Sequence, residues 1–372
     1  SEKIYRHKIG IDYKNDHLVY HEKDNEFYTG VYRSKSGKYI IIWNSSTLVS
    51  DYHVLNANKP NENFINFTPR GTDHEYSIVH YGTKFYVLTN WNAKNNRLME
   101  VDEKTYDMSK WKEVIPHQND LHLLDIEIFD NHLVISQRKN GLRGLRIIDQ
   151  GTWNDHLISF GEETYATWLS TNKEFNTNIL RYSYSSLVTP WSTYDYNMDS
   201  EEKILLKQDE VLGGYNHENY FSERLYAKSR DGQLIPIYLV YRKNLKKDGP
   251  QPLLLYSYGA YGSTEDPYFS IVRLSLLDRG FIYAIANIRV SYQNIQNGFG
   301  QLKVQRLLLE QQLNSLEGAE VNLESEYEKA QENEREFVKS LNEKYGPGTL
   351  NPETGVFTPV PTETPAEDTP KS

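Results

Sequence analysis

The sequence contains no cysteine among its 372 residues. Disulfides, thiolate metal sites and a cysteine nucleophile are therefore excluded, although cysteine usage leaves the cellular compartment open. No apolar run reaches the ~20 residues that a membrane-spanning helix needs, and the N-terminal residues SEKIYRHKIG have no signal-peptide core. We expect no membrane partner and a cytoplasmic location, for a chain that starts inside a strand and looks truncated at its N-terminus.

A basic surface is missing as well. The formal net charge is −10, and 14 acidic against 5 basic residues from Glu310 to Ser372 account for −9 of it. The preceding 309 residues are thus almost neutral. Nucleic-acid binding usually needs a clustered basic face, so the sequence predicts no nucleic-acid partner. It also contains no pattern that indicates a cofactor.

Short apolar or alternating runs, separated by Gly, Asn and Asp, fill residues 17–207 and are typical of antiparallel strands. Four similar runs begin 46, 48 and 46 residues apart, at Lys38, Lys84, His132 and Asn178. One such unit divides into the strands HEYSIVHY, KFYVLTNW, RLMEVD and WKEVIPH. Four strands in every ~45 residues predict the blades of a β-propeller, with a β-sandwich as the alternative.

The runs IYRHKIG and HLVYHEK look like the end of an earlier blade, which predicts about four and a half blades over residues 1–210. A long hairpin and two apolar runs, PLLLYSYG and GFIYAIANI, then predict the start of an α/β layer over residues 211–300. Near-continuous apolar strands indicate burial on both faces. Between the two runs, Ile271, Leu274 and Leu277 predict the buried face of a short helix.

A different pattern follows. Ten residues from Leu309 to Leu341 recur at alternating spacings of four and three, which is the period of a coiled-coil seam. Glu320 and Glu334 occupy two of these positions and weaken the pattern. The spacing is therefore compatible with a single amphipathic helix as well as with an oligomer.

The seam predicts a helical, coiled-coil-like segment over residues 301–345, with self-association through residues 304–342 as one of the two arrangements. Association should be weak at neutral pH, because a charged glutamate is costly to bury, and stronger at about pH 4, where carboxylates become neutral. Residues 346–372 are rich in turn residues and then in Pro, Glu and Thr, and we expect them to be disordered.

Several segments in a single order carry a resemblance, among them VYHEKDNEFY, LRYSYSSLVTP, KQDEVLGGY, LLLYSYGAYG and RLSLLDRGFIYAIANIR. The chain resembles the prolyl oligopeptidase family of serine peptidases, and within it the oligopeptidase B group, collinearly from Ile4 to Arg289. The resemblance implies a mainly β fold, with part of a seven-bladed propeller followed by the first strands of an α/β-hydrolase domain. It also implies descent from serine oligopeptidases that cleave short peptides after Arg or Lys.

The resemblance implies an incomplete catalytic site. The family's Gly-x-Ser-x-Gly nucleophile elbow occurs nowhere in this sequence, and the Ser-Asp-His region follows the part of the family that matches. We therefore expect the chain to be catalytically silent by itself. A peptide-binding or scaffolding propeller that oligomerises through its C-terminal helix is the alternative. One family site does map here, because Tyr258 aligns with a tyrosine that donates its hydroxyl to the oxyanion.

A second candidate consists of His74, Glu75 and His80. Metal-binding histidines on a helix are spaced four residues apart, and the spacing here does not match. On a strand, His74 and His80 would share a face but lie ~20 Å apart. We expect structural or surface histidines and no metal site.

A third candidate is a small basic cluster of Arg138, Lys139, Arg143 and Arg146. Such a cluster could bind the carboxylate of a peptide in a propeller channel. A solvated strand face is the other interpretation, and the one the residue types favour.

Overall fold

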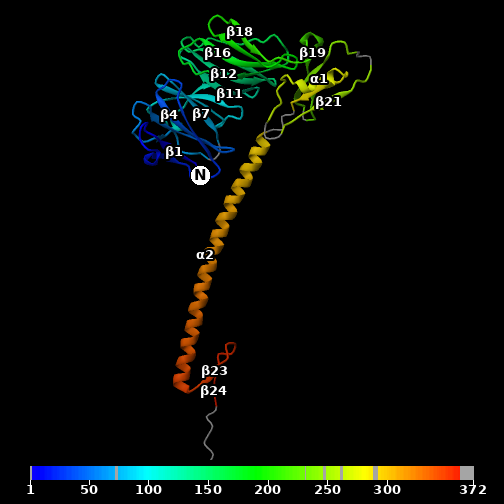
Figure 1. Ribbon diagram of the computed structural model, residues 1–372. Helices are drawn as coiled ribbons and strands as arrows, with labels where there is room; N and C mark the ends of the chain where they lie inside the picture. Colours follow the sequence, from blue (N-terminus) through cyan, green and yellow to red (C-terminus); the bar gives the residue numbers. More distant parts are fainter. Residues whose placement is uncertain are drawn as a thin grey trace, which may run out of the picture. The chain divides into compact units, whose positions relative to one another are not determined.

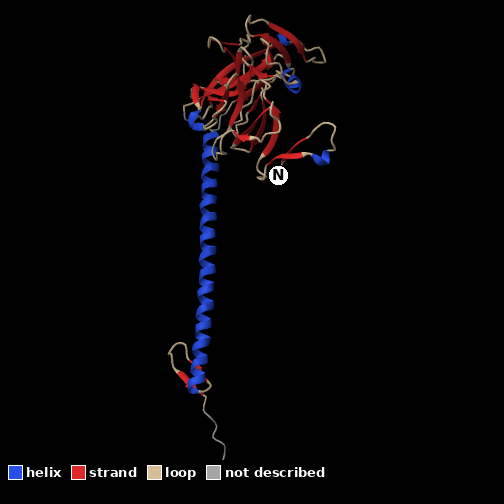
Figure 2. Cartoon of the chain, turned by 90° about the vertical axis from the view of Figure 1, so that its left-hand side faces the viewer, coloured by secondary structure: helices blue, strands red, loops and turns tan. Residues whose placement is uncertain are grey.

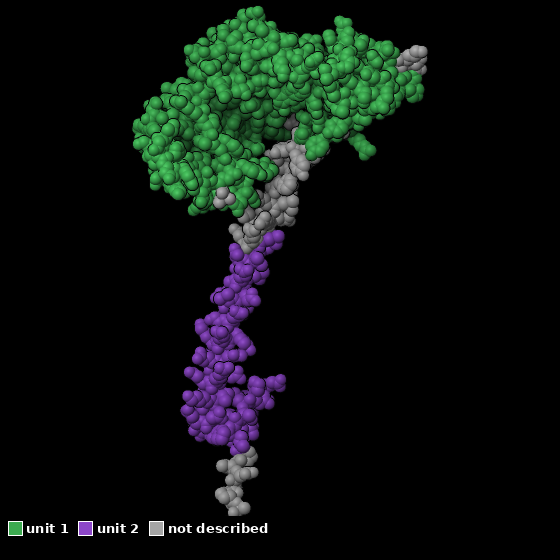
Figure 3. All heavy atoms as spheres, viewed as in Figure 1, with its two compact units in different colours: residues 1–296 green, residues 297–372 purple. Residues whose placement is uncertain are grey.

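The computed structural model describes residues 2–71, 74–230, 232–245, 249–259, 263–287 and 292–360. The chain divides into two compact units, residues 1–296 and 297–372 (Figure 3), which we describe separately. Strands dominate the first unit, and the second is built on one long helix (Figure 2). The chain is thus mainly β with a helical tail, as its sequence predicts.

Four consecutive four-stranded antiparallel sheets, each a meander in chain order, form four complete propeller blades (Figure 1). The first blade contains β3 (Tyr28–Arg33), β4 (Tyr39–Ser45), β5 (Ser50–Asn56) and β6 (Ile65–Asn66), and the second β7 (Tyr76–Tyr81), β8 (Lys84–Thr89), β9 (Arg97–Asp102) and β10 (Lys112–Ile115). The third contains β11 (Leu121–Ile128), β12 (His132–Lys139), β13 (Leu142–Asp149) and β14 (Asp155–Leu157), and the fourth β15 (Tyr165–Leu169), β16 (Ile179–Ser186), β17 (Ser192–Asn197) and β18 (Lys203–Gln208).

A two-stranded sheet of β1 (Lys3–Arg6) and β2 (His17–His21) precedes the first blade. The prediction of about four and a half blades is confirmed, and the alternative of a β-sandwich is wrong. Within the described residues, three short 3-10 helices occur in the connections, η1 (Tyr13–Asn15), η2 (Met108–Lys110) and η3 (His217–Asn219).

The blades bury both faces of their sheets against one another. In β8, Phe85 and Val87 point into a cluster shared with the first blade, whereas Tyr86 and Leu88 point into a cluster shared with the third. A further apolar cluster joins the third blade to the fourth. Because successive side chains of a strand point to opposite faces, two-sided burial requires an almost continuously apolar strand. The run KFYVLT meets this requirement, and five of its six residues are buried.

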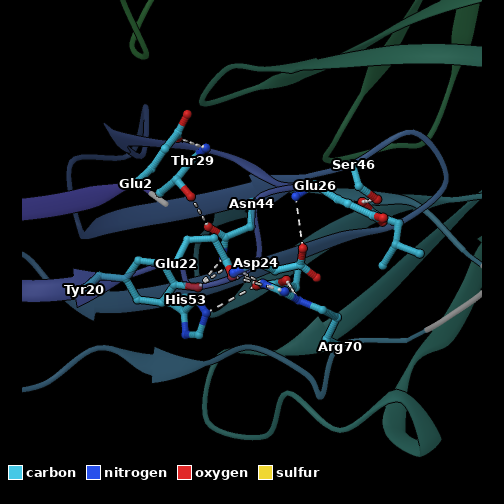
Figure 4. A network of polar contacts seen from close by, with 12 residues as sticks. Glu2, Tyr20, Glu22, Asp24, Glu26, Thr29, Asn44, Ser46, His53 and Arg70 are labelled. Atoms are coloured by element: carbon cyan, nitrogen blue, oxygen red, sulfur yellow. Dashed lines mark hydrogen bonds and ion pairs between the residues drawn. The ribbon is translucent and has the colours of Figure 1, made fainter.

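The junction between the β1–β2 sheet and the first blade is polar instead. Arg70 donates to Glu22 Oε2 at 2.5 Å and also to Asp51 Oδ2. Glu22 and Asp51 are only 4% and 2% exposed. Asn44 donates to Asp51 Oδ1 at 2.7 Å, and His53 Nε2 lies 3.2 Å from the same oxygen. Figure 4 shows the side chains of Glu22, His53 and Arg70 turned toward one another, so one guanidinium serves two buried carboxylates.

Burial alone would raise the pKa of both carboxyl groups. In Glu22 the hydrogen bonds from Arg70 and from the backbone outweigh burial, and in Asp51 those from His53, Asn44 and Arg70 do so. The pKa of each carboxyl group is therefore lowered in the folded chain. Such groups stabilise the fold above their unfolded-state pKa, and this contribution is lost as the pH falls through the folded-state pKa. The network consequently contributes most at neutral pH.

Replacing the shared guanidinium tests this junction. We expect Arg70→Met to lower the free energy of unfolding by about 3–5 kcal/mol at pH 7, because two buried carboxylates lose their cation. The deficit should shrink as the pH is lowered, since the carboxylates become neutral. Arg181→Met is the control: Arg181 pairs with Asp195 at a largely exposed site, and its loss should cost far less, because solvent screens an exposed pair. Urea denaturation at several pH values measures both, and equal losses would contradict the assignment.

After the fourth blade the chain forms a mixed four-stranded sheet in the order β19–β20–β22–β21. Its strands are β19 (Tyr220–Lys228), β20 (Leu234–Arg242), β21 (Leu253–Tyr256) and β22 (Ile282–Ala286), and α1 (Ile271–Leu277) connects β21 to β22. β21 and β22 pair in parallel, whereas the other pairs are antiparallel. This arrangement is the predicted start of an α/β layer, and we call it the hydrolase segment after the resemblance in its sequence.

Two expectations about the hydrolase segment are wrong. Both apolar runs were expected to be buried, but only β22 is, and every residue of β21 is exposed. The reason is that α1 packs against β20 and β22 and leaves both faces of β21, the edge strand of the described sheet, uncovered. In α1, Leu277 is buried and Leu274 packs against the core, but Ile271 is 55% exposed.

Most of α2 (Tyr292–Tyr345), a helix of 54 residues that begins earlier than residue 301, belongs to the second unit. It ends at Tyr345, and the next residue, Gly346, has a φ of 84°, the left-handed conformation that glycine favours at a helix terminus. A small hairpin of β23 (Gly348–Leu350) and β24 (Phe357–Pro359) follows. The expected disorder is therefore wrong for these strands, and residues 361–372 lie outside the described part. Neither described α-helix has both the length and the apolar character that a bilayer crossing requires.

Candidate functional site

A carboxylate clamp, formed by Asp266, Arg138 and Arg143, ties the hydrolase segment to the propeller. Asp266 lies in the loop between β21 and α1, and the two arginines stand on β12 and β13 of the third blade. Arg138 Nη1 donates to Asp266 Oδ1 at 2.6 Å and its Nη2 donates to Oδ2 at 3.1 Å. Arg143 Nε donates to Oδ2 at 2.8 Å. A bidentate pair with a third donor holds the carboxylate in one orientation.

The carboxylate clamp is shielded from solvent. Asp266 is 7% exposed and the side chain of Arg138 11%. Burial lowers the pKa of the Arg143 guanidinium, although Asp266 opposes this. Arg138 also donates to the carbonyl of Gly141 at 2.7 Å, at the turn of the β12–β13 hairpin. A Cβ at Gly141 would lie 2.5 Å from the hydroxyl of Tyr238, so the hairpin and β20 approach as closely as a glycine allows.

A shared apolar core supports the carboxylate clamp. Tyr238 of β20 is fully buried in a cluster that includes Leu142 from the third blade and Leu187 from the β16–β17 connection of the fourth. The backbone N–H of Phe269 donates to Ser185 Oγ of the fourth blade at 2.9 Å. The propeller therefore supplies part of the core of the hydrolase segment, and the loop that carries Asp266 contacts two blades.

Neither interpretation describes the predicted basic cluster as a whole. Arg138 and Arg143 bind a carboxylate, but it is that of Asp266 in the same chain. Arg146 pairs with an aspartate of the neighbouring strand β14. The Nζ of Lys139 lies 3.3 Å from the carboxylate of a different aspartate, at the surface of the third blade. A solvated strand face therefore describes Lys139 but is wrong for Arg138. Nothing in the local sequence marks Asp266, because its two partners lie 128 and 123 residues earlier in the chain.

Tyr258, the predicted oxyanion residue, lies two positions beyond the end of β21. Its side chain is 44% exposed, and Tyr256, the last residue of β21, is 41% exposed. The strand that carries it is held by its parallel pairing with β22, which is buried in the core shared with the propeller. The phenol is thus accessible to a ligand at the end of a strand with a defined position. Its role in oxyanion binding stays a prediction.

His74 and His80 of the second blade do not have the spacing of metal-binding histidines, and His80 belongs to a polar network. His80 is 2% exposed, and its Nδ1 lies 2.8 Å from Ser36 Oγ while its Nε2 lies 2.9 Å from Glu103 Oε2. Ser36 belongs to the first blade, and His80 and Glu103 belong to the second. Lys38 donates to both oxygens of Glu103, at 2.7 and 2.6 Å. The network therefore links two neighbouring blades.

A serine, a histidine and a carboxylate in contact raise the question of nucleophilic catalysis. Burial lowers the pKa of His80, although Glu103 opposes this, so the neutral imidazole, the form of a general base, is favoured. However, the same carboxylate is neutralised by Lys38, and His80 is sealed from solvent. The serine also contacts Nδ1, whereas in serine hydrolases the nucleophile contacts Nε2. The arrangement fits a structural link. Among the described residues, no group of His, Asp and Glu forms a metal site.

The geometry and the comparisons with known proteins agree on the family. The family described as "Prolyl oligopeptidase, N-terminal beta-propeller domain" matches residues 1–209. This match covers the four blades and the strand pair that precedes them. The chain belongs to the prolyl oligopeptidase family, as the resemblance in its sequence implies.

Characterised relatives extend the likeness beyond the propeller. Dipeptidyl aminopeptidase BI of Pseudoxanthomonas mexicana is 39% identical over 78% of this chain and 40% of its own length, and Protease 2 of Moraxella lacunata is 31% identical over 77% and 41%. Oligopeptidase B from Trypanosoma brucei superposes with a TM-score of 0.71 at 32% identity, covering 78% of this chain and 42% of that one. The structure from Leishmania major gives 0.70 at 30%. The chain spans about 40% of the length of these relatives.

The carboxylate clamp can be tested by removing one charge. We expect Asp266→Asn to lower the free energy of unfolding by about 3 kcal/mol, because two largely buried guanidinium groups lose their anion while the shape is kept. Asp155→Asn is the matched control, since Asp155 pairs with Arg146 at a more exposed site and should matter by less than about 1 kcal/mol. Denaturant unfolding measures both variants. Indistinguishable losses would show that the clamp does not hold the two parts together.

Proposed function

We propose that this chain is the propeller and oxyanion-side part of a serine oligopeptidase that acts on short peptides after Arg or Lys, and that by itself it does not hydrolyse them. Family membership supports the peptidase assignment, and the oligopeptidase B structures among its relatives support the basic specificity. The absence of a Gly-x-Ser-x-Gly motif from the 372 residues supports the lack of activity. The cytoplasmic location expected from the sequence stays a prediction.

The main support for the proposal is the way the hydrolase segment packs on the propeller. It takes core residues from the third and fourth blades, and the carboxylate clamp fixes the loop that follows Tyr258. In this proposal the propeller positions the β21 end, and Tyr258 donates its hydroxyl to the oxyanion of a peptide bond under attack. The nucleophile and its base would have to come from residues other than these.

The second candidate function is a peptide-binding scaffold. The seam residues of α2 support it, because large apolar side chains such as Leu316 and Leu323 are 67% and 66% exposed. A helix that displays such side chains is suited to bring copies or partners together. In that case the propeller would present peptides without any catalytic role for Tyr258.

The absence of hydrolysis is the first test. We expect the purified chain to leave dipeptide-Arg reporter substrates intact and to remain unlabelled by a fluorophosphonate, because it has no nucleophile elbow. Complete oligopeptidase B from Trypanosoma brucei, assayed beside it, serves as the positive control. Saturable turnover that disappears when one particular serine of this chain is changed to alanine would refute the proposal.

The second test concerns Tyr258. We expect Tyr258→Phe to change the free energy of unfolding by less than about 1 kcal/mol, because the ring is half-exposed and only the hydroxyl is removed. Tyr238→Phe is the comparison, since the hydroxyl of Tyr238 accepts a hydrogen bond from Asn287 in the core and its loss should cost more. A larger loss at position 258 than at position 238 would assign Tyr258 a structural role instead.

A further inference from the structure

The long helix α2 displays an apolar stripe between Leu313 and Phe337. Leu313, Leu316, Leu323, Tyr327 and Phe337 are each between 55% and 67% exposed. They occupy positions of the seam whose spacings alternate between four and three residues. A straight helix has about 3.6 residues per turn, whereas this spacing averages about 3.5 residues. Side chains with the shorter spacing keep facing a partner only when the two helices wind around each other. The stripe therefore indicates a helical partner.

The residues beside the stripe carry negative charge. Glu317 and Glu324 each follow a seam leucine directly, Glu326 precedes Tyr327, and Glu320 occupies a seam position itself. From residue 307 to residue 328 the helix contains no basic residue. In a two-helix coiled coil, the residues that flank the seam face those of the partner, so charges there decide which partner is accepted.

A second copy of the helix satisfies the apolar stripe but not these charges. In a parallel pair, Glu320 would face Glu320 and Glu334 would face Glu334 on the seam. An antiparallel pair relieves this only in part, because Lys329, Arg335 and Lys339 lie away from the seam and its flanks, on the outer surface of the helix. A register with Tyr327 opposite Phe337 brings Lys344 opposite Glu320, but it places Glu334 opposite Ala330 and leaves Leu313 and Leu316 uncovered. No single register of two copies therefore gives every seam and flanking glutamate a cation. Burying unpaired carboxylates opposes the pairing.

We propose that α2 is the docking surface for a basic amphipathic helix of another protein, with apolar residues at the same spacing and Lys or Arg beside them. The partner's apolar residues cover the stripe between Leu313 and Phe337. Its cations face Glu317, Glu320, Glu324 and Glu326, which removes the repulsion that a second copy would meet. The inference concerns the second unit alone and does not depend on the peptidase assignment.

Synthetic helices of about four heptads provide the test. One has Leu and Ile on its seam and Lys on the flanks, the second has the same seam with Glu on the flanks, and the third is the basic peptide with its apolar residues scattered over all faces. Fluorescence anisotropy measures the binding of each to the full chain. We expect the basic helix to bind at least about tenfold more tightly than the acidic one and the scattered one, and to bind more weakly as NaCl rises from ~0.05 to ~0.5 M.

Variants of the chain locate the binding surface. The triple change Glu317→Lys, Glu324→Lys and Glu326→Lys should reverse the preference, so that the acidic helix binds more tightly. The matched control Glu328→Lys, Glu332→Lys and Glu336→Lys makes the same change in net charge at outer positions and should keep the preference for the basic helix. Leu316→Asp with Leu323→Asp should abolish binding of both peptides, and circular dichroism checks that the helix is retained in every variant.

Three results would overturn the proposal. Equal affinity for the basic and acidic helices, or binding that the scattered peptide matches, would show that the seam does not select its partner. The same shift in preference from both triple variants would assign the effect to net charge alone. A tight dimer of the unmodified chain at neutral pH in sedimentation, lost in the Leu316→Asp and Leu323→Asp variant, would make a second copy the occupant.

Discussion

The burial of both sheet faces is the constraint on which the propeller depends. A blade of four short strands has too little apolar surface to be stable alone, and each one packs on its neighbours through side chains that alternate along the strand. Clusters of this kind join the first blade to the second, the second to the third and the third to the fourth. The central strands of the blades are therefore mostly apolar, although β12 also buries Ser136 and Gln137. Networks of buried charges lie at the junctions between the blades and other elements.

Polar contacts at these junctions join the blades to other elements of the chain. At the β1–β2 sheet, Arg70 neutralises two buried carboxylates in place of an apolar contact. At the hydrolase segment the propeller contributes both apolar side chains and the two arginines of the carboxylate clamp. A polar junction of this type is more demanding in geometry than an apolar one, since each buried charge needs its partner in a defined direction. The clamp thus gives the loop between β21 and α1 a fixed position relative to the third blade.

Patterns among neighbouring residues predict the strands of this protein, whereas contacts between residues far apart in the chain are visible only in the fold. The spacing of similar runs and the alternation within them predict blades, because strand periodicity depends only on neighbouring residues. The same reasoning is wrong for β21, whose four apolar residues are exposed because α1 packs on β20 and β22 and leaves its faces uncovered. It is also wrong for Arg138, since the partner that buries it is 128 residues away. His80 was expected to be structural or a surface residue, and its partners Ser36 and Glu103 come from two different blades.

The sequence by itself determined the repeat of blades, the family, the absence of a nucleophile elbow and the apolar and acidic pattern of the long helix. Each of these is written in the order and spacing of residues. Only the tertiary structure decided which charges are paired and which apolar strands are covered, as Asp266 between two arginines and the exposed β21 show. The reason is that burial and charge pairing depend on distances across the fold, which are set by how the strands pack and not by their separation along the chain.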